Sequence, residues 1–173
     1  MLLEKSFITV VLAVGMVAST ASTIQASEDK DASAAGKRIQ EALAKLAKGS
    51  GEWKRFSVTY DDLHALHGGL TLTIHGTGKV TQTAVRQQVG EQKEVSATEL
   101  KQLVELLQKH KAWEQKEVQR PAVRDESQAR LVVTYGDDSV TVWEWYNDLP
   151  KNKRLVEILE AMQKAAWKSV PKQ

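Results

Sequence analysis

The chain has 173 residues, of which 42% are hydrophobic and 27% charged, with a formal net charge of +2 and no cysteine. This length suits one ordinary domain with a core of its own. The absence of cysteine excludes disulfides, thiolate metal sites and thiol nucleophiles, and the interspersed acids and bases predict a solvated surface, not the clustered Lys and Arg of a nucleic-acid interface.

The N-terminus has the three parts of a secretory signal. A short basic start precedes an apolar run from Phe7 to about Ala18, and a stretch of small residues ends at Ala26. The apolar run is shorter than the ~20 residues that span a bilayer. We therefore expect residues 1–26 to be a signal peptide, with cleavage after Ala21 as the alternative, and no stable membrane span after cleavage. The mature chain is predicted to be periplasmic or extracellular.

Residues 27–50 are predicted to form a polar leader followed by a short amphipathic helix. Residues 27–36 are polar and rich in small side chains, which is typical of a mobile leader. From Lys37 to Lys48 apolar residues recur at helical spacing, and the glycines at 49 and 51 end the helix. The apolar stripe consists of Ile39, Ala42, Leu43 and Leu46. A helix this short is marginal in water unless its stripe is buried.

Three strands are predicted between residues 53 and 89. Residues 53–60 and 70–75 alternate between apolar and polar side chains, and residues 79–89 return after a turn at 76–78. The polar positions of these strands hold Thr59, Thr71, Thr73, Thr81 and Thr83, together with His75. Threonine suits the wet face of an antiparallel sheet.

A helix is predicted from Ser96 to about His110. Ser96 and Glu99 have the spacing of a capping box, and the stripe that follows consists of Leu100, Leu103, Val104 and Leu107. Residues 112–118 are predicted to form a short edge strand that begins near Trp113, and residues 119–128, which contain a proline, a loop.

Residues 129–146 contain two alternating runs on either side of Gly136 to Ser139, which predicts a β-hairpin. Counting outward from this four-residue turn pairs Tyr135 with Val140 and Val133 with Val142. The predicted core face consists of Leu131, Val133, Tyr135, Val140 and Val142, and the opposite face of Val132, Thr134, Trp143 and Trp145. A final helix, capped by residues 147–150, is expected to bury Leu155, Ile158, Leu159, Met162 and Ala166.

These elements predict an α+β fold for residues 51–173, taken as a single domain. The sheet is expected to be antiparallel, with about five strands built from two hairpin-helix units. The helices are expected to pack on one face of the sheet, and the N-terminal amphipathic helix is an addition to this core arrangement.

This order of elements resembles that of small exported bacterial α+β domains of unknown function. The likeness covers residues 52 to 168 and implies the fold and export, but no activity. In such domains the loop before the second strand often carries cysteines, where this chain has His64 and His67. The residues that carry the likeness are Phe56-Ser-Val-Thr-Tyr60, Leu70-Thr-Leu-Thr-Ile-His-Gly-Thr-Gly-Lys-Val80, Val95-Ser-Ala-Thr-Glu-Leu100 and Leu131-Val-Val-Thr-Tyr135.

One candidate metal site lies in this loop. His64 and His67 are three residues apart, and Asp61 or Asp62 could add an oxygen ligand, so the cluster could bind one Zn²⁺ or Cu²⁺. The alternative is a pair of solvated loop histidines, because a metal site needs three or four convergent ligands. No other cofactor is predicted.

Surplus aromatic residues suggest a contact surface. Trp143 and Trp145 are predicted to share one face of a strand, and the expected register places Arg130 opposite Trp145, close enough for cation–π stacking. This trio is the predicted binding surface for a protein, a peptide or a glycan. The alternative is that another segment covers this face, since Trp is usually largely buried.

Signatures of catalysis are missing from the sequence. It contains neither a Gly-x-Ser-x-Gly elbow nor a Gly-rich phosphate loop, and turn chemistry explains the adjacent acids Asp137 and Asp138. The predicted function is therefore that of an exported, non-enzymatic binding or interaction domain. Two alternatives stay open: a metal-binding protein that uses the His-x-x-His loop, and a small hydrolase whose site forms only in three dimensions.

Overall fold

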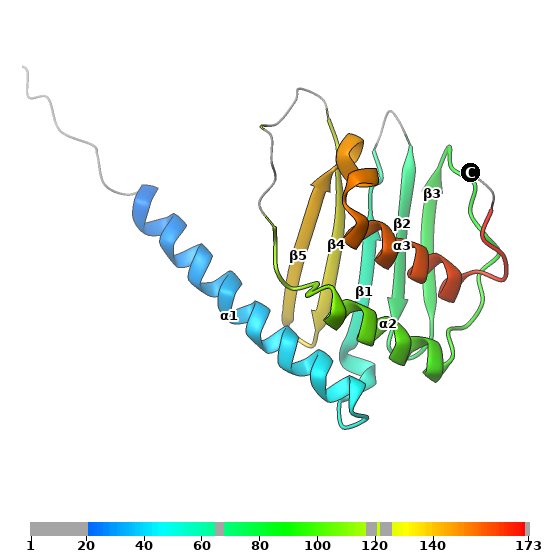
Figure 1. The fold of residues 1–173 in the computed structure, drawn as a ribbon, viewed down its shortest axis with the longest axis horizontal. Helices are drawn as coiled ribbons and strands as arrows, with labels where there is room; N and C mark the ends of the chain where they lie inside the picture. Colours follow the sequence, from blue (N-terminus) through cyan, green and yellow to red (C-terminus); the bar gives the residue numbers. More distant parts are fainter. Residues whose placement is uncertain (1–20, 65–67, 117–120, 122–125, 172–173) are drawn as a thin grey trace, which may run out of the picture.

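The computed structural model describes residues 21–64, 68–116, 121 and 126–171. Within these residues, five antiparallel strands form one sheet in the order β3-β2-β1-β4-β5, and three α-helices pack against it (Figure 1). The strands are β1 (Phe56–Asp61), β2 (Gly69–His75), β3 (Val80–Val85), β4 (Gln128–Tyr135) and β5 (Asp138–Trp145), and the helices α1 (Ala21–Ala47), α2 (Ala97–Lys109) and α3 (Lys153–Ala166). The predicted α+β class and its two hairpin-helix units are confirmed.

The core lies between one face of the sheet and the helices. Each strand alternates, so that β1 buries Phe56, Val58 and Tyr60 while the residues between them are only partly buried. The opposite, helix-free side of the sheet is called the open face below. It consists of Ser57, Thr59, Asp61, Gly69, Thr71, Thr73, His75, Thr81, Thr83, Val85, Gln128, Arg130, Val132, Thr134, Ser139, Thr141, Trp143 and Trp145. The predicted placement of the threonines is confirmed.

Helix α1 is longer than the helix predicted from Lys37. It begins at Ala21, so the predicted leader at 27–36 is helical and continuous with residues 21–26. The polar composition of residues 27–36 led to the prediction of a mobile leader, but the alanines and long charged residues there have good helix propensity. The predicted stripe is buried, from Ile39 to Leu46, and contacts α2 and β5. Residues 1–20 of the predicted signal lie outside the described residues. No helix in the described part of the chain is both long and apolar enough to cross a membrane.

The predicted capping box at the start of α2 is confirmed. The Glu99 amide donates to Ser96 Oγ at 3.3 Å, and the Ser96 amide donates to Glu99 Oε2 at 2.9 Å. Lys93 Nζ donates to Glu99 Oε1 at 2.5 Å, and this bond, with those from Ser96, lowers the pKa of Glu99 to about 2. Two reciprocal bonds satisfy amides that a helix start otherwise leaves without partners.

The register of the β4–β5 hairpin differs from the prediction by two residues. Tyr135 pairs with Asp138, and Val133 with Val140, because Gly136 and Asp137 alone make the turn. Gly136 adopts a φ of +63° and donates its amide to the Arg55 carbonyl at 2.9 Å, a conformation that glycine adopts without strain. A shift of two preserves the faces, so Leu131 and Val142 are buried as predicted.

The predicted edge strand at 112–118 is absent from its described part, residues 112–116. Ala112 is buried in the turn that follows α2. Instead of a strand, the side-chain amide of Gln115 pairs with the edge of β5: its Nε2 donates to the Trp143 carbonyl at 3.1 Å, and its Oε1 accepts from the Trp143 amide at 2.8 Å. One amide group thus satisfies two backbone groups that a neighbouring strand would otherwise pair.

Two further boundaries differ from the prediction. Strand β3 ends at Val85, short of residue 89, because Arg86 turns the chain with a φ of +56°. Residues 146–151 form a short 3₁₀ helix, η2, and the N-cap of α3 is Asn152, whose Oδ1 accepts from the Leu155 amide at 3.2 Å. Of the residues expected to face inward on α3, Leu159 is only partly buried, and the others are buried.

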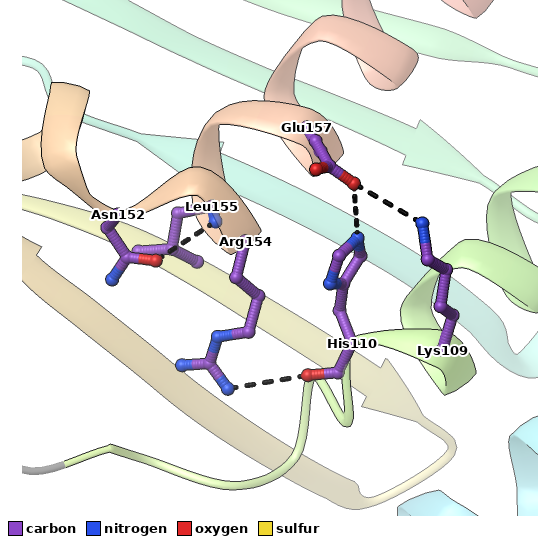
Figure 2. A network of polar contacts seen from close by, with 6 residues as sticks. All are labelled: Lys109, His110, Asn152, Arg154, Leu155 and Glu157. Atoms are coloured by element: carbon purple, nitrogen blue, oxygen red, sulfur yellow. Dashed lines mark hydrogen bonds and ion pairs between the residues drawn. The ribbon is translucent and has the colours of Figure 1, made fainter.

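Helices α2 and α3 are joined by a polar contact around Arg154 (Figure 2). Arg154 Nη1 lies within hydrogen-bond distance of three carbonyl oxygens after α2, the closest being that of Glu114 at 2.8 Å. The Arg154 Nε and Nη2 atoms are buried without a partner, and burial lowers the pKa of this guanidinium. Nearby, His110 Nε2 lies 2.8 Å from Glu157 Oε2, so the end of α2 also contacts α3 through this pair.

Substitution of Arg154 tests this contact. Arg154→Ala should lower the free energy of unfolding by roughly 2–3 kcal/mol, since three partly buried carbonyl contacts are lost and the buried stem of the side chain leaves a gap. Arg154→Met should cost less, because it keeps the packing and removes two unpartnered donors. Urea denaturation measures both. Lys153→Ala, at an exposed neighbouring position, is the control, and an equal effect of all three substitutions would contradict the assignment.

Candidate functional site

Rows of side chains cross the open face at right angles to the strands. One row holds Thr81, Thr73, Thr59, Val132 and Thr141, each the Cα partner of the next across β3, β2, β1, β4 and β5. Within it, the Thr59 and Thr73 hydroxyls are hydrogen-bonded at 2.9 Å. The open face therefore presents regularly spaced hydroxyl groups on rigid strands.

The next row carries the charged and aromatic groups of the open face. It runs Thr83, Thr71, Asp61, Arg130 and Trp143. A shallow trough of about 490 Å³ lies over the last four of these residues. Its lining residues are Thr59, Asp61, Thr71, Gln128, Arg130, Val132, Thr141 and Trp143. The trough brings together an acid, a base and an indole ring on three adjacent strands.

Asp61 and Arg130 face each other across β1 and β4, yet each makes its hydrogen bonds elsewhere. Asp61 Oδ1 accepts from Thr71 Oγ1 at 2.6 Å. Arg130 Nε and Nη2 both donate to Gln128 Oε1, at 3.2 and 3.1 Å. Since Arg130 is exposed and has five N–H groups, it keeps donors that these two bonds do not use, on the strand next to Asp61.

The two predicted tryptophans differ in exposure. Trp143 is partly buried and lines the trough, while Trp145 is buried, with 8% of its surface exposed. Their rings pack edge to face with centroids 5.1 Å apart, so Trp145 supports Trp143 from the side. The observed register corrects the predicted pairing: Arg130 is opposite Trp143, and Gln128 is opposite Trp145.

Of the predicted metal ligands, the structure describes Asp61, Asp62 and His64, and the last two line one small pocket. Asp61 belongs to the open face, whereas the His64 amide and carbonyl bond to Gly68 in an isolated bridge, each at 2.9 Å. His67 lies outside the described residues. Among the described residues, no group of three or more His, Asp or Glu side chains is arranged to hold a metal ion. The hypothesis of a Zn²⁺ or Cu²⁺ site that includes His67 stays a prediction.

The sequence analysis missed a buried polar pair on the other face of β1. Tyr60 donates its hydroxyl to Asp62 Oδ2 at 2.8 Å, and the Leu70 amide donates to Asp62 Oδ1 at 2.6 Å. Burial raises the pKa of Asp62, and burial together with the Asp62 charge raises the pKa of Tyr60. The strand period could have found this pair, because Asp62 continues the buried positions Val58 and Tyr60.

Glycine at position 69 makes room for Asp62. Gly69 adopts a φ of +134°, and a Cβ atom there would lie 2.5 Å from the Asp62 carbonyl oxygen and 2.7 Å from its Oδ1. A larger residue would therefore displace the carboxylate. Gly69 thus leaves the space in which the Asp62 carboxylate lies.

No family model, no curated protein and no solved structure matches this chain. The resemblance to small exported bacterial domains therefore stays a prediction.

The raised pKa of Asp62 predicts a pH dependence of stability. Because the folded state holds this proton more tightly than an unfolded chain, where the ordinary pKa is 3.8, the stabilising contribution is fully present below that value and is lost as pH rises through the raised pKa. Asp62→Asn removes this loss while keeping an acceptor for Leu70. Urea denaturation from about pH 3 to 7 should show the Asn variant gaining stability relative to wild type as pH rises.

Asp61→Asn, which removes the neighbouring carboxylate from the open face, is the control for the total charge. A difference between the Asp62→Asn variant and wild type that stays constant with pH, or shrinks, would contradict the assignment.

Proposed function

We propose that this chain is an exported binding domain whose open face binds a linear, hydroxyl-rich glycan. The signal-like N-terminus supports export. The observation that carries the binding proposal is the trough in which Asp61, Arg130 and Trp143 stand next to one another across three strands.

The chemistry of the trough fits sugars. Sugar hydroxyls both donate and accept hydrogen bonds, so an Asp61 carboxylate, an Arg130 guanidinium and threonine hydroxyls can all be satisfied by one ligand. The C–H face of a pyranose ring can lie on the indole of Trp143, which offers a large apolar surface that is already held in place by Trp145.

The polarity of the open face favours a glycan over a protein partner. Protein interfaces usually have an apolar centre with aromatic, Met or Arg anchors, and Ser and Thr rarely contribute strongly to affinity. Around the trough, the apolar side chains are Val132 and Trp143, and most of the rest are hydroxyl, amide or charged groups. The row from Thr83 to Trp143, over which the trough lies, crosses five strands. Its length is about 19 Å at normal strand spacing, which suits a linear oligosaccharide.

A glycan array with the labelled full chain, followed by calorimetry with cellohexaose and chitohexaose, tests this proposal. We expect binding to at least one linear glycan. Trp143→Ala and Arg130→Ala should each weaken the binding about tenfold or more, a loss of about 1.4 kcal/mol. Thr134→Ala is the matched control: it lies on the same strand and face as Arg130, outside the trough.

Circular dichroism establishes that each variant is folded. An array without a retained glycan, or affinities that Trp143→Ala and Arg130→Ala leave unchanged, would overturn the proposal. If the chain instead binds peptides, and both substitutions weaken that binding, the open face is the binding surface but its ligand is a protein. That result would also overturn the glycan proposal.

A further inference from the structure

A second pocket, distinct from the trough, lies on the helix side of the sheet. It has a volume of about 800 Å³ and lies between the end of β1, the segment after β3, η2, α3 and the chain beyond α3. This volume is within the range of small-molecule sites. None of its lining residues belongs to the trough, so the two candidate sites are independent.

The pocket combines apolar walls with a polar floor. Its apolar walls include Leu149, Val156, Leu159 and Trp167, from η2, α3 and the residue after it. Its floor includes the Tyr60–Asp62 pair and Gln163. Asp62 and Gln163 are 7% and 5% exposed, so two polar side chains more than nine-tenths buried face a cavity whose lining is mixed, with apolar side chains from η2 and α3 and polar ones from the segment after β3. Such an arrangement is typical of a site that orients a ligand.

Asp62 has acceptor capacity left for a ligand. From the described residues, its two carboxylate oxygens accept hydrogen bonds from the Tyr60 hydroxyl and the Leu70 amide, whereas an ionised carboxylate offers about four lone-pair sites. Burial penalises this charge, as the raised pKa of Asp62 indicates. A cationic donor inside the pocket would offset that penalty, because opposite charges favour each other's ionised form at low local dielectric.

The remaining titratable groups at this pocket set its preference. Glu160 on α3 and Arg86 after β3 line it, and the Tyr146 hydroxyl adds a neutral polar group. With Asp62 ionised, the charged groups among the described lining residues are two carboxylates and one guanidinium. This part of the pocket therefore carries a net negative charge and disfavours anions. The Trp167 indole donates to Gln82 Oε1 at 2.7 Å, which holds this wall in place.

We propose that this pocket binds a small primary amine with an aromatic or branched apolar tail. The ammonium group donates to the Asp62 carboxylate at the floor, and the tail packs between α3 and the Trp167 indole. An acid of the same shape is excluded by charge, and a neutral alcohol of the same shape binds more weakly because it lacks the ion pair.

The test uses the full chain and three probes of similar shape: 2-phenylethylamine, 2-phenylethanol and 3-phenylpropionate. Two-dimensional ¹⁵N NMR titration gives both the affinity and the location. The amine should shift the amides around Leu70 and α3 and bind at least tenfold more tightly than the alcohol, while the acid should give no saturable shift.

Two variants separate binding from folding. Asp62→Asn keeps the shape of the floor and should remove the preference for the amine over the alcohol. Leu159→Trp, at a partly buried position of α3, fills the pocket without changing charge and should abolish binding of both. Trp143→Ala, in the trough, is the control and should leave the amine titration unchanged. The glycan proposal can therefore fail without affecting this one.

Equal affinities for the three probes, shifts confined to the open face, or an amine preference that survives Asp62→Asn would each overturn the assignment. A Leu159→Trp variant that is folded and still binds the amine would do the same.

Discussion

The arrangement of the molecule depends on the alternation of its central strand. Because β1 is paired on both edges, with β2 and with β4, its side chains can point only to the open face or to the helices. Asp61 and Asp62 are neighbours in the chain, yet the first lies in the trough and the second at the floor of the helix-side pocket. Both candidate sites thus arise at the same end of one strand.

The polar groups of the interior are concentrated under and around α3. Tyr60 and Asp62 lie at one end of the core, and Arg154 lies where α3 begins. The first two are joined by a hydrogen bond of 2.8 Å from the Tyr60 hydroxyl to Asp62 Oδ2. Arg154 satisfies three carbonyls but leaves two of its own nitrogens without partners. Helix α1 buries an apolar stripe, and among its described residues Arg38 also forms an exposed ion pair with Asp138 of β5, at 2.7 Å. Buried polar contacts, which water does not screen, are thus described for α3 and not for this part of α1.

Local patterns in the sequence were enough to predict the fold class. The capping box at Ser96, the stripes of α2 and α3 and the alternation of the strands are each readable within a few residues, and each has a single physical interpretation. Core faces were predicted correctly even where the hairpin register was not. A slip of two residues returns every side chain to the same face, whereas a slip of one would have turned Leu131 and Val133 toward solvent.

Contacts between segments that are far apart in the chain could not be predicted from the sequence. The expected strand at 112–118 is replaced in its described part by one side-chain amide, that of Gln115, which bonds to β5. Composition could not show that a single glutamine would do this. Two local boundaries were also predicted wrongly, the start of α1 and the N-cap of α3. An alanine-rich polar segment and a turn that contains Asn are each compatible with more than one local structure.

In the candidate sites, too, residues close in the chain could be grouped from the sequence, and residues far apart in the chain could not. Arg130 and Trp143 could be grouped from the sequence because they lie on one hairpin, within 13 residues of each other by their numbers. Asp61 was instead grouped with His64 and His67, its neighbours in the chain. In the structure the pairing of β1 with β4 brings Asp61 opposite Arg130, and strand alternation separates it from Asp62. A cluster of chemical groups along a strand is thus divided between two faces, while residues about 70 positions apart are brought together by the sheet.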